Sequence, residues 1–370
     1  MSKIENLIKQ YCPNGCEWKT VGECVRILDG QRKPITKAAR ISGKYPYYGA
    51  NGVQDYVADY IFDGTYVLIG EDGSVVTPEG YPIVHWVEGK IWVNNHAHIV
   101  EEMQGVSLRY FFHAISNCNV SNLIHGNIPK LNQGDFRAIQ IPVPPLPVQE
   151  EIVRILDKFT ELEKELEKEL EMRKKQYEFY RDKLLTFGDD VERKRLGDVC
   201  ILSAGGDAPK THMSKIKSDE YKYPIYSNGI GDNALYGYTY EYKISSPCVT
   251  VAARGTIGWA ALRTDPFYPI VRLICVLPKD YGELNVAFLK YFIDTIEFSV
   301  PEGGIPQLTV PMLKNLVIPV PSLQEQQRIV EILDTFDTLT TDLTQGLPAE
   351  IKMRRMQYEY YRDYLFGLLK

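Results

Sequence analysis

The stretch Ile141-Pro142-Val143-Pro144-Pro145-Leu146 recurs later in the chain as Ile318-Pro319-Val320-Pro321-Ser322-Leu323, at an offset of 177 residues. From Ile141 to Phe159, 12 of 19 positions are identical in the two copies. A second block, from Met172 to Asp182, recurs from Met353 to Asp363 with 8 of 11 identities, at an offset of 181 residues. Two such matches in the same order indicate a duplicated unit, far longer than a solenoid repeat, with four residues added in the second copy.

The segments between these blocks match more weakly. Lys44-Tyr45-Pro46-Tyr47-Tyr48 resembles Lys222-Tyr223-Pro224-Ile225-Tyr226, and an Asn-Gly pair follows both. Leu108-Arg109-Tyr110-Phe111 resembles Leu289-Lys290-Tyr291-Phe292. We therefore predict that a head domain and a helical region alternate twice, with heads at residues 1–147 and 188–323 and helical regions at residues 148–187 and 324–370.

Each helical region has the spacing of a coiled-coil seam. Apolar or aromatic side chains recur in steps of four and three, with one extra step of four. In the first copy they begin with Val148, Ile152, Ile155, Phe159, Leu162, Leu166 and Leu170. A seam needs a partner, and the nearest equivalent surface is that of the other copy, so we expect two antiparallel helices related by an approximate two-fold axis. The proline runs predict an extended segment before each helix. Gly346 and Pro348 predict a kink or a restarted helix in the second copy.

The composition is typical of a soluble globular protein, with 44% hydrophobic and 24% charged residues over 370 positions. No apolar stretch reaches the roughly 18 residues that cross a bilayer, and the first residues lack the layout of a secretory signal. Seven scattered cysteines predict free thiols and a cytoplasmic protein. The net charge of -6 argues against a generally basic nucleic-acid coat, but local basic surfaces remain possible.

Both heads carry short apolar runs bounded by turn residues, such as Thr65–Ile69 and Val249–Ala252. This pattern predicts mixed α/β heads dominated by irregular sheet. The expected fold class is therefore α+β, with two mixed α/β head domains joined by two long antiparallel helices that form a coiled coil.

Polar loops and basic stretches at equivalent places in both heads predict a nucleic-acid surface. In Asn94-Asn95-His96-Ala97-His98, the amides can pair with adenine and the histidines suit phosphate or base contacts. Basic residues repeated in both heads favour an edge that faces phosphates. The candidate DNA-binding residues are Arg32, Lys33, Lys44, Tyr48, Asn51, Ser74, Asn94, Asn95 and His96 in the first head, and Lys210, His212, Asn228, Arg254 and Thr256 in the second.

Each of these features also has a purely structural interpretation. The segment from Asn94 to His98 can be a strand whose alternate residues hydrogen-bond the core, and this alternative is favoured for the segment taken alone. Loops such as Gly70–Ser74 are most often ordinary turns, and basic runs are most often solvated faces.

Signals of catalysis are poor. The chain has no phosphate loop of the G-x-x-x-x-G-K type and no dinucleotide fingerprint after a strand. Glu88-Gly89-Lys90 matches only the end of a nuclease motif. Cys12 and Cys16, with Cys24 nearby, lack a second pair at zinc-binding spacing. We therefore predict no catalytic residue, no metal site and no cofactor.

The duplicated Ile141–Leu146 segment with Gln149, and the duplicated Gln176-Tyr177-Glu178-Phe179-Tyr180-Arg181-Asp182, resemble the conserved helical regions of the specificity (S) subunit of type I restriction-modification systems. Cys12-Pro13-Asn14-Gly15 and Leu347-Pro348-Ala349-Glu350-Ile351 are also similar to that family. The resemblance covers nearly the whole chain and is specific in the helices, whereas in the heads it extends to the framework only.

The resemblance implies a non-catalytic subunit that reads a bipartite double-stranded DNA target, two half-sites with an unread spacer, through two target-recognition domains. It implies that two methyltransferase subunits dock on the chain, that restriction subunits join through them, and that S-adenosylmethionine, ATP and Mg²⁺ belong to those partners. The alternatives are a DNA nuclease or methyltransferase with a coiled-coil stalk, and a scaffold without a DNA role. A complete or duplicated catalytic set would favour an enzyme, and neither is found.

Overall fold

The computed structural model describes residues 2–73, 75–298 and 306–370. The chain divides into two compact units. Unit 1 comprises residues 1–167 and 350–370, and unit 2 comprises residues 168–349. Each unit therefore contains one head together with parts of both helical regions.

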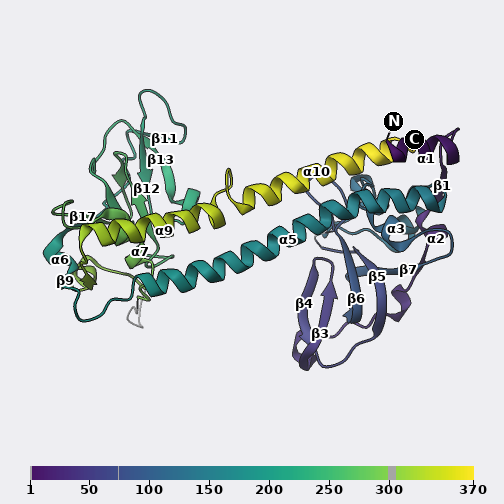
Figure 1. Ribbon diagram of the computed structural model, residues 1–370, viewed down its shortest axis with the longest axis horizontal. Coiled ribbons are helices and arrows are strands. Elements are labelled where there is room, and N and C mark those ends of the chain that lie inside the picture. The colour runs from purple at the N-terminus through teal and green to yellow at the C-terminus, as the bar shows by residue number, and fades with distance from the viewer. Residues whose placement is uncertain (1, 74, 299–305) are drawn as a thin grey trace. The chain divides into compact units, whose positions relative to one another are not determined.

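The head of unit 1 is built on a six-stranded sheet with strand order β2-β7-β5-β6-β3-β4. Neighbouring strands are antiparallel except β3 and β6, which are parallel. Within β5, Val67, Leu68 and Ile69 are all fully buried, as expected of a strand covered on both faces. Figure 1 shows these strands side by side. Their bounds are β2 Val25–Ile27, β3 Ser42–Gly49, β4 Gly52–Val57, β5 Phe62–Gly70, β6 Val84–Val93 and β7 Ala97–Glu102.

Helices cover one face of this sheet. The main core joins residues of β5 and β7 to α3 (Leu108–Ile115), to the start of α5 (Leu146–Leu184) and to the end of α10 (Leu347–Gly367). Val148, Ile152 and Leu156 of α5 are completely buried in it. A capping box between Ser2 and Glu5 starts α1 (Lys3–Tyr11). The remaining short helices are α2 (Val21–Cys24), α4 (Gln133–Ala138), and the 3-10 turns η1 (Asp29–Gln31), η2 (Lys37–Ala39) and η3 (Ser121–Leu123).

The head of unit 2 has two four-stranded sheets, with orders β10-β17-β14-β15 and β11-β13-β12-β16. Its main core joins the first sheet to α7 (Val286–Ile293) and α9 (Leu323–Thr341), with Leu289 and Leu333 fully buried. The other elements are α6 Leu196–Val199, β10 Cys200–Ala204, β11 Met213–Ser214, β12 Tyr223–Tyr226, η4 Gly231–Ala234, β13 Leu235–Thr239, β14 Cys248–Val251, β15 Ala260–Arg263, β16 Tyr268–Pro269, β17 Ile274–Pro278 and α8 Val310–Lys314.

The proline-rich segments close both heads in the same way. In unit 1, β8 (Gln140–Val143) pairs antiparallel with β1 (Glu17–Thr20), so that Ile141 lies opposite Lys19. In unit 2, β18 (Val317–Pro319) pairs antiparallel with β9 (Arg193–Arg195), so that Ile318 lies opposite Lys194. The prediction of an extended segment before each helix is confirmed.

The helical regions also behave largely as predicted. Helix α5 is continuous over 39 residues, whereas the second region breaks into α9, which ends at Thr341, and α10, which begins at Leu347. The predicted restart around Gly346 and Pro348 is therefore confirmed. None of the helices in the described ranges combines the length and the apolar character that a membrane span requires.

Within each unit the two helical regions pack against each other. In unit 1, Phe159 stacks on Tyr361 with ring centroids 5.0 Å apart, and Glu163 accepts a hydrogen bond from Arg355 at 2.9 Å. From the first pair to the second, the residue number rises along α5 and falls along α10, so the two helices are antiparallel. In unit 2, Tyr180 stacks on Phe336 at 5.7 Å.

The predicted seam is wrong at Leu162, whose side chain is 41% exposed. The neighbouring Glu163 faces the other helix instead, with a side chain only 17% exposed in its ion pair with Arg355. A charged pair thus occupies a place that spacing alone assigns to leucine.

A buried glutamine joins each head to its helix. The Gln149 side chain is fully buried, donates to the carbonyls of Pro144 at 2.8 Å and Gly105 at 3.0 Å, and accepts from the Ser107 amide at 3.0 Å. In the second copy, Gln326 is equally buried. It donates to the carbonyls of Pro321 and Glu283 and accepts from the Asn285 amide, at distances of 2.8 to 2.9 Å. The same amide therefore satisfies three backbone groups in both units.

An aspartate on the same helix makes a second, less similar contact. Asp157 accepts from the Nε2 atom of the buried His113 at 2.8 Å, and its counterpart Asp334 accepts from the Tyr291 hydroxyl at 2.6 Å. Burial lowers the pKa of His113, although its hydrogen bond to Asp157 works in the opposite direction.

These contacts correct one alignment. Because Ser107 and Asn285 precede α3 and α7 and bind equivalent glutamines, Leu108 corresponds to Val286 and not to Leu289. A slip of three residues is nearly one helical turn, so it returns the apolar side chains to about the same face and still produces a match.

We predict that Gln326→Leu lowers the free energy of unfolding of unit 2 by about 3 kcal/mol, because one amide hydrogen and two carbonyl groups lose a buried partner. Gln324→Leu on the exposed face of α9 is the matched control and should change it by less than about 0.5 kcal/mol. Chemical denaturation of the full chain measures both changes in the free energy of unfolding. Equal changes would contradict the conclusion that Gln326 joins the head of unit 2 to α9.

Candidate nucleic-acid interface

Three loops meet at one edge of the unit 1 sheet. They are residues 71–73 after β5, residues 94–96 between β6 and β7, and residues 129–132 before α4. The Glu71 amide donates to the carbonyl of His96, and the Leu131 amide donates to the carbonyl of Glu71, both at 2.8 Å. The loop at 94–96 is thus held by a second loop that is itself held by a third.

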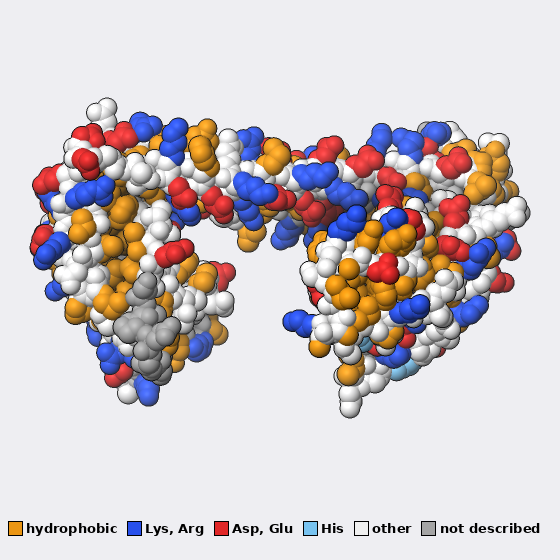
Figure 2. All heavy atoms as spheres, turned by 90° about the horizontal axis from the view of Figure 1, so that it is seen from below, with side chains coloured by type: hydrophobic (Ala, Val, Ile, Leu, Met, Phe, Trp, Pro, Cys, Tyr) orange, Lys and Arg blue, Asp and Glu red, His pale blue; other side chains and the backbone are white. Residues whose placement is uncertain are grey.

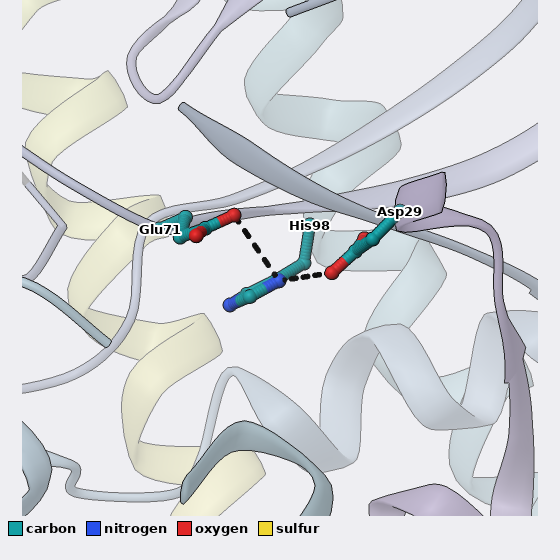
Figure 3. A group of neighbouring side chains, drawn as sticks. All are labelled: Asp29, Glu71 and His98. Carbon is teal, nitrogen blue, oxygen red and sulfur yellow. Dashed lines mark hydrogen bonds and ion pairs between the residues drawn. The ribbon is translucent and has the colours of Figure 1, made fainter. Parts of the chain in front are cut away.

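A buried histidine lies beneath these loops. His98, on β7, is fully buried and stacks on Phe136 at 4.5 Å. Its Nδ1 atom contacts the Asp29 carboxylate at 2.7 Å, and its Nε2 atom contacts the carbonyl of Leu131 at 2.9 Å. Figure 3 shows His98 between Asp29 and Glu71, whose carboxylate lies 3.6 Å from Nδ1.

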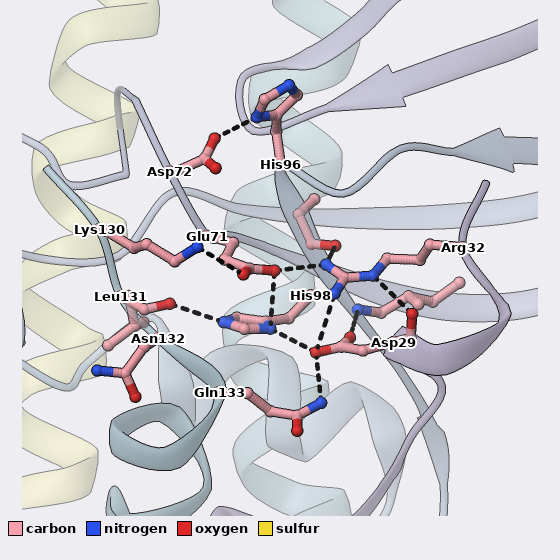
Figure 4. Close-up of polar contacts among 12 residues, drawn as sticks. Asp29, Arg32, Glu71, Asp72, His96, His98, Lys130, Leu131, Asn132 and Gln133 are labelled. Atoms are coloured by element: carbon pink, nitrogen blue, oxygen red, sulfur yellow. Dashed lines mark hydrogen bonds and ion pairs between the residues drawn. The ribbon is translucent and has the colours of Figure 1, made fainter. Parts of the chain in front are cut away.

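Cations and an amide surround the two carboxylates. Arg32 donates to Glu71 at 2.5 Å and to the carbonyl of Ala97 at 2.7 Å, and it forms an ion pair with Asp29 at 3.6 Å. Lys130 lies 3.2 Å from Glu71, and Gln133 donates to Asp29 at 2.9 Å. Figure 4 shows that these contacts link η1, the start of β7, the loops that carry Glu71 and Lys130, and the start of α4, and that His96 of the remaining loop contacts Asp72.

The electrostatics of this cluster favour the ionised form of Asp29. Burial alone raises the pKa of Asp29, but the hydrogen bond and charge of His98, together with the charge of Arg32, outweigh burial and hold the pKa below its usual value. Asp29, Glu71 and His98 have the atom types and spacing of a metal site. However, their oxygen atoms are already engaged by Arg32, Lys130 and Gln133, so the residues do not fit a resident cation, and we assign the cluster a positioning role.

Within the segment from Asn94 to His98, Asn94, Ala97 and His98 are buried, whereas the two residues between Asn94 and Ala97 are exposed. Asn94 is 2% exposed, donates to Gln54 at 3.2 Å and accepts from the His96 amide at 2.8 Å. Both Asn94 and His98 hydrogen-bond inward, as the structural alternative expects, but only His98 does so from a strand, because Asn94 lies in the loop before β7. Asn95 and His96 are exposed, and the His96 ring contacts Asp72.

The other candidate DNA-binding residues of unit 1 differ in their exposure to solvent. Lys33, Lys44 and Asn51 are exposed, whereas Tyr48 is half-buried and accepts from the Asn94 amide through its carbonyl at 3.0 Å. Burial raises the pKa of the Tyr48 hydroxyl. Ser74 lies outside the described residues.

In unit 2 the structure brings three candidates together. The Asn228 side chain donates to the carbonyl of Val271 at 2.6 Å and accepts from the Ala253 amide at 2.8 Å, and its backbone carbonyl accepts from the Thr256 hydroxyl at 2.7 Å. The neighbouring Arg254 donates to Gln307 at 2.7 Å. Asn228 therefore fixes the loop 253–256 against the turn at Val271.

Lys210 and His212 lie in a separate loop before β11. Lys210 is exposed, and His212 contacts Thr211 at 2.7 Å and lies over the Tyr240 ring at 5.2 Å. On the face shown in Figure 2, basic and acidic side chains are interspersed over both units, without one continuous basic area. A DNA contact through this face would therefore depend on local groups.

The duplicated unit has counterparts among known proteins. The sequence profile of a family described as the type I restriction modification DNA specificity domain matches residues 13–172 and 188–353, one match on each copy. The chain belongs to this family.

Curated relatives match nearly all or part of the chain. A putative type I restriction enzyme specificity subunit of Haemophilus influenzae is 37% identical over 376 residues, which cover 95% of each chain. The EcoR124I/EcoR124II specificity subunit of Escherichia coli is 37% identical over 259 residues, which cover 63% of this chain and 64% of that protein. The solved S subunit of M. genitalium covers 96% of both chains with a TM-score of 0.59 and 17% identity, so it shares the fold.

Sequence reasoning missed the support beneath the loops of this specificity-family protein. Asp29, Glu71 and His98 lie far apart in sequence, and only their convergence on β7 gives them a common role. His98 was visible within the polar segment 94–98, but its inward direction depends on strand register, which starts at Ala97.

We predict that Arg32→Ala lowers the free energy of unfolding of unit 1 by about 2–3 kcal/mol, because two nearly buried carboxylates lose their shared cation. Lys33→Ala removes the adjacent but exposed charge and should cost less than about 0.5 kcal/mol. Hydrogen exchange of the amides in β7 measures the loss of protection in each variant. Equal protection in both variants would show that Arg32 does not hold the loops.

Proposed function

We propose that this member of the specificity family reads a bipartite double-stranded DNA target, with one half-site for each head and an unread spacer between them. The duplication carries this proposal, because both family matches include a head with its following helix and both heads are joined by an equivalent glutamine. The proposed domain limits remain those of the sequence, at residues 1–147, 148–187, 188–323 and 324–370.

The exposed members of the loops are the proposed DNA contacts. In the first head, Asn95 and His96 project from a loop that the buried cluster holds in place, and exposed cations such as Lys33 and Lys44 suit phosphates. Asn94, Arg32 and Tyr48 contribute by positioning that loop. In the second head, Asn228 positions the loop that carries Arg254 and Thr256, and Lys210 and His212 supply a separate contact.

We further propose that the subunit performs no chemistry itself and acts in the cytoplasm. The nuclease or methyltransferase alternative needs free carboxylates or a cofactor site. The one three-residue acidic and histidine cluster found in the described ranges is neutralised by Arg32 and Lys130. S-adenosylmethionine, ATP and Mg²⁺ are then bound by partner subunits.

Duplicated apolar side chains on the helices support two docking sites for methyltransferase subunits. Met353 and Tyr360 of unit 1 are 61% and 67% exposed, and their counterparts Met172 and Phe179 of unit 2 are 68% and 62% exposed. Exposed apolar groups at matching positions are typical of binding surfaces. Restriction subunits would join through the methyltransferases. A chain of the same fold, with a TM-score of 0.56 and 17% identity, comes from a study of complex assembly in the type I R-M system.

Reconstitution with a methyltransferase partner tests this function. Native mass spectrometry should detect two methyltransferase subunits per chain, and the complex should methylate DNA at a bipartite sequence. The isolated chain should neither methylate nor cleave DNA. Turnover by the isolated chain would contradict the non-catalytic role, and a stable one-to-one complex at saturating partner would contradict the two docking sites.

Residues 161–168 of α5 repeat the sequence Glu-Leu-Glu-Lys twice. This repeat allows a geometric test, since the boundary between the units falls inside it, between Glu167 and Lys168. Inserting one more Glu-Leu-Glu-Lys after Lys168 adds about 6 Å of helix without altering either head. We predict that methylation sequencing finds both half-sites unchanged and a longer spacer between them. Altered half-sites with the original spacer would show that the helices do not set the spacing.

A further inference from the structure

The backbone of unit 2 contains one conformation that its residues should avoid. Val271 and Arg272 have φ angles of 52° and 61°, and they are the only non-glycine residues with positive φ in the described part of the chain. Two successive positive φ angles characterise a turn that is normally filled by Asn-Gly, and a β-branched residue such as valine is especially unfavourable there.

This turn is held by hydrogen bonds from several elements. The amides of Val271 and Arg272 donate to the carbonyls of Gly206 and Gly205 at 2.8 and 2.9 Å, and the Leu273 amide donates to the Ile270 carbonyl at 3.0 Å. Asn228 binds the Val271 carbonyl at 2.6 Å. The surrounding structure thus imposes the conformation on the backbone.

The side chains of Val271 and Arg272 are not buried in the core. Val271 is 47% exposed, and Arg272 is exposed as well. Among the described residues, the Arg272 side chain makes no hydrogen bond or ion pair. Backbone strain that packing does not offset is characteristic of functional sites.

The turn occupies the place of the loop 94–96 in unit 1. The β7 strand pairs with β5 so that Ala97 lies opposite Gly70, and β17 pairs with β14 so that Ile274 lies opposite Val251. On the other side, the Asn94 amide donates to the Tyr48 carbonyl, as the Ile270 amide donates to that of Tyr226, at 3.0 and 2.9 Å. The loop 94–96 leads into β7, which precedes α3. The Val271–Arg272 turn leads into β17, which precedes α7.

We propose that the Val271–Arg272 turn is the base-reading element of the second head, with the Arg272 guanidinium contacting a guanine edge in the major groove. This inference rests on the proposed DNA-reading function. It adds a residue that reads one base position of the second half-site. A phosphate contact needs only an exposed cation, whereas reading a base edge requires a fixed backbone, and the turn provides one. The valine methyl groups beside the guanidinium suit a neighbouring thymine methyl.

The test uses the full chain reconstituted with its methyltransferase partner and a randomised duplex DNA library, whose methylated products are sequenced. Arg272→Ala should relax one base position of the second half-site by about tenfold or more and leave the first half-site unchanged. Arg272→Lys keeps the charge but loses the paired donors, and it should relax the same position. Lys314→Ala removes another exposed charge of unit 2 and should leave both half-sites unchanged.

A fold readout accompanies these variants. Arg272→Ala should unfold at the same temperature as the parent chain, whereas Val271→Asn, which tolerates positive φ, should unfold at a higher temperature. An unchanged second half-site in Arg272→Ala would overturn the inference. So would a uniform loss of affinity on all sequences with a smaller salt dependence, because that is the behaviour of a phosphate contact. Absence of any bipartite methylation by the parent complex would instead overturn the proposed function itself.

Discussion

The side-chain amide of one buried glutamine fixes each head to its helix. In unit 1, the strand β7 connects this amide to the loop 94–96, which carries the proposed DNA contacts. In unit 1, Gln149 binds Ser107 and Gly105 next to α3. The α3 helix in turn begins at Leu108, whose amide donates to Glu102 at the end of β7 at 2.9 Å. The other end of β7 begins at Ala97, directly after the loop 94–96. The position of the loop relative to the first part of α5 is therefore set by a short chain of hydrogen bonds between rigid elements.

Much of this architecture could be predicted from the sequence because its signals are local or repeated. The duplication, the extended proline segments and the break near Gly346 depend only on spacing and on the known behaviour of proline and glycine. The errors occur where spacing is ambiguous. A helix tolerates a slip of three residues in alignment, and a charged pair such as Glu163 with Arg355 can replace a leucine at a seam.

The candidate site was predictable in type but not in detail. Polar loops in both heads were recognisable, yet whether Asn94 or Asn95 faces outward depends on where β7 begins. The positioning cluster joins Asp29 to Glu71 and His98 across distant segments, which no local pattern reveals. The turn at Val271 and Arg272 lacks the Asn-Gly pair that would mark it as a turn in the sequence. Only the offset of 177 residues, which carries Ile141 to Ile318, could have mapped Asn94 and Asn95 onto Val271 and Arg272.

The glutamine joints have a consequence for how such chains diversify. Gln149 and Gln326 hydrogen-bond only to backbone groups, so these bonds do not depend on the side chains that the head presents to DNA. A head of different sequence that keeps these three groups in place would be anchored equally well. Selection on the reading surface is then mechanically independent of selection on the frame. The repertoire of targets open to such a chain grows as the product of the variants available to each head.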